Sequence, residues 1–285
     1  MKLAADCMGC LISRVEYESR LCIDDPLRVS EIVDACRNLL ERIAADPVPA
    51  PIIASRIHRV AYRMIGDPDP YRSLKRGNNA DAAAVCRAVR GDLSTFHDLA
   101  LASVIGNTLD YGSQAHTVTD NFVEFFRREF AAGLTVDDTA AMEALTSRVV
   151  YLADNCGEIV FDALFADYLK KNGSNVTFAV RGAPILNDVT LEDAVAFGLD
   201  RRVDLLTPTT DGIAELGLNR DLAPPALADA LDRATLVIAK GMANYESLSD
   251  DRDLPPVAYL MSVKCSPIGA EIGIPVGSRV ALLRE

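Results

Sequence analysis

The sequence has no tryptophan, and aromatic residues make up only 6% of its 285 residues. Basic residues are also scarce: 29 Lys and Arg stand against 41 Asp and Glu, for a net charge of −12. Proteins that bind nucleic acids or anionic membranes need a basic face, and base-stacking modules need aromatic side chains. We therefore expect neither a nucleic acid nor a membrane as partner. A small anion is not excluded, because backbone amides and a few cations can create a local positive site.

Long apolar runs and a disulfide pattern are missing as well. No uninterrupted apolar stretch reaches the roughly 18 residues that a membrane span needs. Asp6 and the pair Cys7 and Cys10 come before any apolar region of a signal peptide. The seven cysteines are odd in number and scattered, whereas disulfide scaffolds are short and carry dense, even sets. These absences predict a soluble, reduced, cytoplasmic protein.

The chain has two parts with different patterns. Residues 1–145 read as mainly helical, because apolar residues recur there at helical spacing between capping and breaking residues. Helices are expected over residues 11–22, after Ser30 as an N-cap, and over 52–65, 80–89, 95–105 and 118–131. In residues 146–285, short apolar runs alternate with helices. Strands are expected over residues 148–153, 175–180, 202–206, 235–239, 256–261 and 279–283. This alternation predicts an α/β fold with a mostly parallel sheet buried on both faces.

Polar residues follow three of these runs, at the sheet edge where α/β proteins bind their ligands. Asp154 and Asn155 offer hard oxygen ligands after the first run, and Asp188, in the segment after the second, would complete a site for Mg²⁺, Mn²⁺ or a similar ion. Lys240 ends another run and is suited to neutralise a phosphate oxygen, together with Arg181. Turns and helix caps explain each segment alone equally well. Their combination favours a cleft for a metal and a phosphate.

The same segments carry a family resemblance. DNCGEIVFD at 154–162, RGAPILNDVTLEDA at 181–194 and KGMANYES at 240–247 resemble motifs of the metal-dependent damage-control phosphatases, an ARMT-like family long labelled domain of unknown function 89. DPYRSLKRGNN at 69–79, GNTLDYG at 106–112 and KCSPIGAEIGIPVG at 264–277 also resemble family motifs, and CMGC at 7–10 is typical of the microbial branch. The resemblance implies a helical region (1–145) that roofs the pocket and packs on a Rossmann-like three-layer core (146–285), which binds metal and phosphate.

It also implies an activity: hydrolysis of small phosphorylated metabolites, such as sugar phosphates or damaged phosphometabolites, with Mn, Co, Ni or Mg as the divalent ion. Carried over by motif, Asp154, Asn155 and Asp188 are the metal ligands and, with Lys240 as the phosphate-binding lysine, the catalytic group. The nucleophile is then a metal-activated water or Asp154 itself. The substrate-binding residues expected from the motifs and from the strand ends are Asn107, Asp110, Glu158, Arg181 and Glu246.

Three other functions remain open from the sequence. One is a metal- and metabolite-binding protein without catalysis. Another is an S-adenosylmethionine-dependent carboxyl methyltransferase, which is weakened because no glycine-rich loop follows the first strand. The third is a thiol oxidoreductase based on Cys7 and Cys10, although this pair lies outside the βαβ region where such motifs belong. Cys265 is a candidate third member of that cysteine group.

Overall fold

A computed structural model describes residues 1–108 and 122–285. Within these residues, seven strands form one sheet in the order β1-β7-β6-β5-β2-β3-β4. The strands are β1 (Val136–Asp137), β2 (Arg148–Leu152), β3 (Asn175–Val180), β4 (Leu205–Pro208), β5 (Leu236–Lys240), β6 (Val257–Ser262) and β7 (Arg279–Arg284). All neighbouring pairs are parallel except β6 and β7. The prediction of an α/β fold with a mostly parallel sheet is therefore confirmed.

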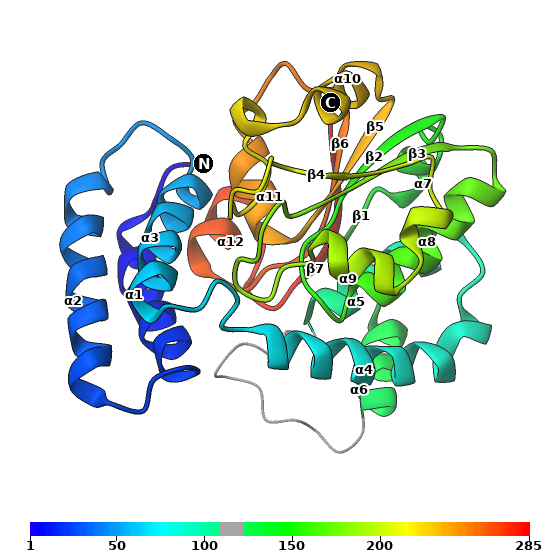
Figure 1. Ribbon diagram of the computed structural model, residues 1–285. Helices are drawn as coiled ribbons and strands as arrows, with labels where there is room; N and C mark the ends of the chain where they lie inside the picture. Colours follow the sequence, from blue (N-terminus) through cyan, green and yellow to red (C-terminus); the bar gives the residue numbers. More distant parts are fainter. Residues whose placement is uncertain (109–121) are drawn as a thin grey trace.

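Helices cover both faces of this sheet (Figure 1). One layer contains α5 (Phe96–Thr108), α8 (Ile159–Lys171) and α9 (Leu191–Ala196), and the other contains α10 (Pro225–Arg233), α11 (Gly241–Leu248) and α12 (Ser266–Ile272). Alternate residues of a strand face opposite layers. Val149 and Tyr151 pack toward α8, whereas Val150 and Leu152 belong to the core cluster on the α10 side. Burial on both faces explains why the sequence shows continuous apolar runs here.

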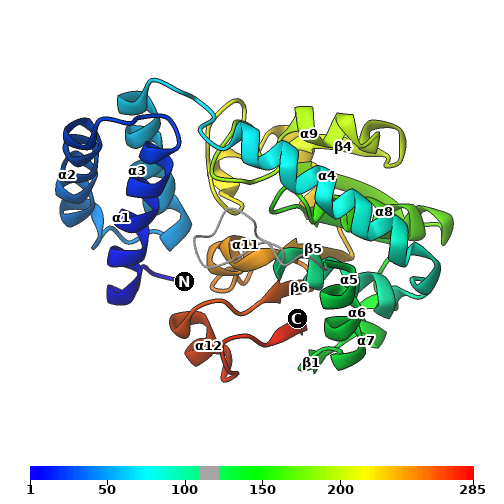
Figure 2. The same ribbon diagram turned by 90° about the horizontal axis from the view of Figure 1, so that it is seen from below.

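The start of the chain forms a separate group of three helices (Figures 1 and 2): α1 (Ala5–Arg20), α2 (Pro26–Ile43) and α3 (Ala50–Ile65), with their own apolar cluster. In α2, Val29, Ile32, Cys36 and Leu40 recur at helical spacing and are buried. The expected N-cap Ser30 is wrong. The N-cap is Asp25, five residues earlier, because its side chain accepts the Leu27 amide at 3.0 Å and Pro26 is favourable at the first helical position.

The helices that follow connect this group to the core. They are α4 (Arg72–Val89), α6 (Phe122–Ala132) and α7 (Thr139–Glu143), with α5 between α4 and α6, and three short 3₁₀ turns at Arg90–Asp92, Leu199–Arg201 and Arg220–Leu222. Helix α4 starts eight residues before the predicted segment, and residues 118–121 of another predicted helix lie outside the described residues. Helix α5 packs on α8, and β1 joins the sheet, so both belong structurally to the core. The division of the chain at residue 145 stays a prediction.

Two further differences from the expected strands concern local detail. The strand expected over 202–206 begins three residues later, as β4, and β1 was not expected because it has only two residues.

Within the described ranges, no helix is both long enough and apolar enough to cross a membrane. The carboxyl ends of β2, β3 and β5 lie next to one another, because these strands are parallel neighbours. The segments predicted to carry function therefore meet at one edge.

The three-helix group offers a direct test of this packing. Leu40 is 1% exposed and Leu27 is 75% exposed, although both lie on α2. We predict that Leu40→Ala lowers the free energy of unfolding by about 2–5 kcal/mol, because it removes buried methyl groups and leaves a cavity. Leu27→Ala should change it by less than about 0.5 kcal/mol. Urea denaturation measures both, and equal losses would contradict the assigned faces of α2.

Candidate active site

Asp154 and Asn155 follow β2 at the carboxyl edge of the sheet, and both are more than nine-tenths buried. Their loop pairs with the loop after β3. The Val189 amide donates to the Asp154 carbonyl at 2.8 Å, the Cys156 amide donates to the Asn187 carbonyl at 2.8 Å, and Asn155 lies opposite Asp188 in an isolated antiparallel bridge. Backbone pairing between two loops thus brings Asp188 next to Asp154 and Asn155, although it is more than thirty residues away in sequence.

Arg181 holds the two carboxylates together. Its side chain is 1% exposed, and its guanidinium donates from Nε to Asp188 Oδ2 at 2.5 Å and from Nη2 to Asp154 Oδ1 at 3.3 Å. The remaining Nη1 donates to the Gly217 carbonyl at 2.7 Å. A planar guanidinium suits such a two-sided contact because its donors are fixed in a fork. Arg181 therefore binds the predicted metal ligands themselves.

The charge of Asp154 is costly in this environment. Burial raises its pKa well above the usual value, and the carboxylates of Asp188 and Glu158 add to the effect, while Arg181 and Lys264 oppose it. Two amides also fix Asp154 Oδ2: Asn155 Nδ2 donates at 2.8 Å, and Asn107 Nδ2, from α5, donates at 3.2 Å. Arg181 and Lys264 thus compensate the ionised form of Asp154 only in part.

Gly241 is the first residue of α11. Because it has no side chain, the Asp154 carboxylate can occupy the position of a Cβ atom. A Cβ at Gly241 would lie 1.9 Å from Asp154 Oδ2, and the residue has φ +69°, which side chains rarely adopt. Both constraints require glycine after Lys240. The sequence KG at the end of β5 is therefore explained by the carboxylate of Asp154.

Lys240 is completely buried, and its ammonium contacts two acids at the start of α8, the N-cap residue Glu158 and Asp162. Its Nζ donates to Glu158 Oε2 at 2.8 Å, to Asp162 Oδ1 at 3.0 Å and to the Ser103 carbonyl at 3.4 Å. Burial alone would lower the pKa of Lys240, but these two carboxylates raise it above its usual value. An ammonium has three donors, so all of them have acceptors here. The contact of Lys240 with a phosphate stays a prediction.

Glu158 is likewise buried and supports the loop that carries the predicted ligands. Its Oε1 accepts the Asn155 amide at 2.6 Å and Asn107 Nδ2 at 3.2 Å. Asp162 Oδ1 also accepts the hydroxyls of Tyr151 at 2.6 Å and Ser103 at 2.7 Å. Glu158 thus lies behind Asp154 and Asn155, and its role as a substrate contact stays a prediction.

Comparison with known proteins agrees with this arrangement. The family model of the damage-control phosphatase ARMT1-like domain matches residues 3–280. The chain belongs to this family. A damage-control phosphatase of Archaeoglobus fulgidus is 39% identical over 292 aligned residues, covering 100% of both chains, and one of Pyrococcus horikoshii is 25% identical over 99% of this chain and 98% of that protein. The relatives' names support a phosphatase-type function.

A crystal structure of a domain-of-unknown-function-89 protein from Pyrococcus horikoshii has the same fold. It superimposes with a TM-score of 0.90 at 24% sequence identity and covers 100% of both chains. At that level of identity, the likeness concerns the fold alone. The resemblance predicted from the sequence motifs is thus confirmed at the level of the family and of the fold.

One residue predicted to bind substrate, Glu246, lies apart from this group, and another has no described position. Asp110 lies outside the described residues. Glu246 lies five residues beyond Gly241 on α11, near the chain start: the Met1 amine donates to its carbonyl oxygen at 2.7 Å. Burial raises the pKa of the Glu246 carboxyl to about 7, with the Met1 amine opposing and Glu271 adding to the shift. Its predicted role in the pocket stays a prediction.

Sequence reasoning missed two lysines near the site. Lys264 follows β6, and its charge acts on the Asp154 carboxyl. Lys75, on α4, is 3% exposed and lies 3.1 Å from Asp69 Oδ2 and 3.4 Å from Asp193 Oδ2. Asp193 caps α9 by accepting from Thr190, so Lys75 ties the helical region to the segment after Asp188. Lys264 was detectable as one more cation just after a strand, whereas the contacts of Lys75 have no local signal.

The donor set fits a hard divalent cation. Asp154 and Asp188 supply carboxylate oxygens, and the Asn155 side chain, whose Nδ2 points to Asp154, supplies an amide oxygen. Throughout residues 1–108 and 122–285, no three or more His, Cys, Asp or Glu side chains form a metal-binding group. The predicted set has only two such residues and takes its third ligand from an amide. A bound cation would oppose the burial and the carboxylate repulsion that together raise the pKa of Asp154.

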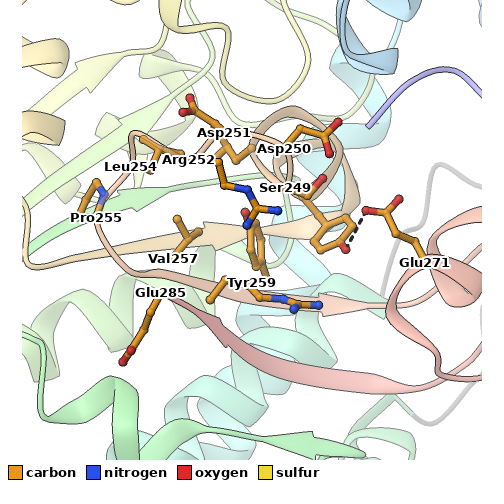
Figure 3. Close-up of a pocket in the computed structure, with 13 residues that line it drawn as sticks. Ser249, Asp250, Asp251, Arg252, Leu254, Pro255, Val257, Tyr259, Glu271 and Glu285 are labelled. Atoms are coloured by element: carbon orange, nitrogen blue, oxygen red, sulfur yellow. Dashed lines mark hydrogen bonds between the residues drawn. The ribbon is translucent and has the colours of Figure 1, made fainter.

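A separate cavity of about 200 Å³ lies at the other end of α11 (Figure 3). Arg252 and Tyr259 line it, and at its edge Glu271 accepts the Tyr245 hydroxyl at 3.1 Å. Its lining includes none of the residues predicted for the site. The cavity is therefore distinct from the carboxylate group around Asp154.

The space beside Gly241 can be tested with a matched glycine. Gly133 has a similar φ of +73°, but a Cβ there would meet nothing within 4 Å. We predict that Gly133→Ala lowers the free energy of unfolding by about 1–2 kcal/mol through backbone strain alone. Gly241→Ala should cost about 2–5 kcal/mol, because overpacking against Asp154 adds to the same strain. If urea denaturation gives equal losses of unfolding free energy for the two variants, a Cβ at Gly241 does not clash with Asp154.

Proposed function

We propose that this protein is a divalent-metal-dependent phosphatase that hydrolyses phosphomonoesters of small metabolites, such as sugar phosphates or damaged phosphometabolites. The observation that carries the proposal is the buried pair of Asp154 and Asp188, held together by Arg181 at the carboxyl edge of the sheet. Membership of the damage-control phosphatase family supports the reaction type. Relatives that share the full length of the chain and carry that name support it further.

In this proposal Asp154, Asn155 and Asp188 hold the ion, which is Mn²⁺, Co²⁺, Ni²⁺ or Mg²⁺. When bound, such an ion supplies positive charge for the phosphoryl oxygens and orients the ester. Arg181 already neutralises one of the two carboxylates, so the divalent ion leaves a net positive centre. That centre attracts a phosphate monoester even though the whole protein is acidic.

The remaining residues of the site hold the proposed metal ligands in position or neutralise buried carboxylates. Phosphoryl transfer depends mainly on alignment and on charge stabilisation, so the ligands must be held rigidly. Asn107 and Asn155 fix Asp154 Oδ2, while Glu158 fixes the backbone of Asn155. Lys240 neutralises Glu158 and Asp162, which lie next to the proposed ligands. These contacts keep the catalytic loop in one arrangement before substrate arrives.

Lys264 is a further cation that we assign to the substrate phosphate, beside Lys240 as predicted from the sequence. Lys264 is only half-buried, follows β6 at the same edge and acts on Asp154 through its charge. We also propose a cytoplasmic location, because all seven cysteines are free thiols, as in reducing compartments.

Removal of either carboxylate tests the reaction. We predict that Asp154→Ala and Asp188→Ala each lower Mn²⁺-stimulated hydrolysis of p-nitrophenyl phosphate by on the order of 10³-fold, because the ion loses a ligand. EDTA should abolish wild-type hydrolysis, and added Mn²⁺ should restore it. Asp34→Ala, which removes an exposed aspartate paired with Arg37, is the control and should keep full activity. Full activity in either site variant, with native circular dichroism, would refute the assignment. Binding of Mn²⁺ and phosphate without hydrolysis in the wild type would favour the non-catalytic alternative.

The role of Lys264 has its own test. We predict that Lys264→Met raises the inhibition constant of inorganic phosphate about tenfold or more, because one charge-assisted hydrogen bond is lost. Mn²⁺ should still bind, since Lys264 is not a ligand. Lys171→Met, at the end of α8, should change neither quantity. An unchanged inhibition constant in Lys264→Met would assign the phosphate contact to another residue.

A further inference from the structure

The loop after β2, which carries two of the predicted metal ligands, is anchored through three successive backbone amides. Each amide donates to a different part of the chain: Asn155 to Glu158 Oε1 at 2.6 Å, Cys156 to the Asn187 carbonyl at 2.8 Å and Gly157 to Asn79 Oδ1 at 2.6 Å. The first two acceptors belong to the α/β core. The third belongs to α4, so a helix from the first part of the chain holds this loop as well.

Gly157 is the point at which this loop turns into α8. It has φ +91°, a backbone conformation that other residues rarely adopt, and it directly precedes the N-cap Glu158. A Cβ at Gly157 would lie 3.6 Å from the Asn78 carbonyl oxygen, so α4 packs closely against the turn. Because Gly157 is buried, its amide depends on an acceptor from the protein. Asn79 supplies that acceptor.

Lys75 holds α4 against the segment that carries the third predicted ligand. It lies four residues before Asn79, and residues at this spacing share one face of a helix. Lys75 Nζ lies 3.4 Å from Asp193 Oδ2, and the same carboxylate accepts the Thr190 amide at 3.0 Å. Helix α4 also packs on α8, and Figure 2 shows the two helices side by side. One face of α4 therefore contacts the loop after β2 and the segment after β3.

The Asn79 side chain has a second partner in the same loop, the Cys156 thiol. Burial raises the pKa of this thiol, and a hydrogen bond from Asn79 opposes the rise. Cys156 Sγ in turn lies 3.9 Å from the Asp188 carbonyl oxygen. Asn79 thus contacts the two residues that directly follow Asn155.

We propose that Asn79 is a positioning residue: it accepts the Gly157 amide and so fixes the loop that presents Asp154 and Asn155 to the divalent ion. This inference rests on the proposed metal-dependent function. Without the acceptor, the Gly157 amide is buried and unpaired, which is unfavourable. The peptide between Cys156 and Gly157 then turns toward another acceptor, and Asn155 loses its fixed direction. All ligands remain present, so the ion still binds, but less tightly.

Metal titration of the full-length chain tests this role. We expect Asn79→Ala to raise the dissociation constant of Mn²⁺, measured by isothermal titration calorimetry, about five- to tenfold or more, as for one unpaired buried hydrogen-bonding group. Asn79→Asp keeps an acceptor and should bind Mn²⁺ at least as tightly as the wild type. At saturating Mn²⁺, Asn79→Ala should regain most of the wild-type hydrolysis of p-nitrophenyl phosphate, because every ligand is still there.

Asn172→Ala is the matched control. Asn172 is the C-cap residue at the opposite end of α8, and its Nδ2 donates to the Tyr168 carbonyl at 2.9 Å. The substitution therefore also removes an asparagine hydrogen bond next to α8, but far from the predicted ligands. Asn172→Ala should bind Mn²⁺ as the wild type does.

Amide hydrogen exchange in the metal-free protein tests the contact itself, without metal binding or activity. We expect exchange at Gly157 to be about tenfold faster in Asn79→Ala, and unchanged in Asn79→Asp and Asn172→Ala. Unchanged exchange in Asn79→Ala would overturn the proposal. So would a lower melting temperature of Asn79→Ala with wild-type Mn²⁺ affinity, which would mean a purely structural role. A wild type that binds no Mn²⁺ would instead refute the proposed function, and the exchange rates would still decide whether Asn79 holds the loop.

Discussion

The guanidinium of Arg181 between two buried carboxylates is the interaction on which the rest of the site depends. Asp154 and Asp188 carry like charges in a place that water barely reaches, and such a pair is unstable without a cation. Arg181 neutralises only one of them and simultaneously binds the Gly217 carbonyl, which ties the pair to the rest of the core. The pair therefore stays together, although full ionisation of both carboxyls remains costly. In the proposed function, a divalent cation would remove this cost.

A second charge network lies next to the first. Lys240 contacts Glu158 and Asp162, and Tyr151 and Ser103 donate to the same Asp162 Oδ1 as Lys240, whereas the buried Asp162 Oδ2 has no hydrogen-bond partner among the described residues. Glu158 connects the two networks, because it also accepts the Asn155 amide. The second network thus supports the loop that carries Asp154 and Asn155. Breaking a buried ion pair on one side costs about 3–5 kcal/mol, so this foundation cannot easily rearrange when a ligand binds.

The sequence predicts the position of Asp154, Asn155 and Asp188 because apolar runs define strand ends, and parallel strands end at one edge. It does not predict what Arg181 and Lys240 contact. Those partners come from a paired loop and from α8, and side-chain direction depends on neighbours that are distant in sequence. Two smaller differences have local causes. Apolar periodicity does not encode strand direction, so the antiparallel β7 could not be singled out. Asp25 is the N-cap of α2 in place of Ser30, because the proline that follows Asp25 favours a helix start there.

Helices α4 and α5, which precede residue 145, contribute residues to the candidate site. Asn107 reaches Asp154 from α5, the Asn79 side chain accepts the Gly157 amide at 2.6 Å, and Lys75 binds the cap of α9. Each contact attaches α4 or α5 to a loop that carries a predicted ligand. A boundary near residue 145 therefore separates sequence patterns better than it separates roles. The helices thus contact the chain on both sides of the carboxylate pair, and Lys240 contacts the loop after β2 through Glu158. Because these contacts come from α4, α5 and β5, the position of the pair depends on elements from both parts of the sequence.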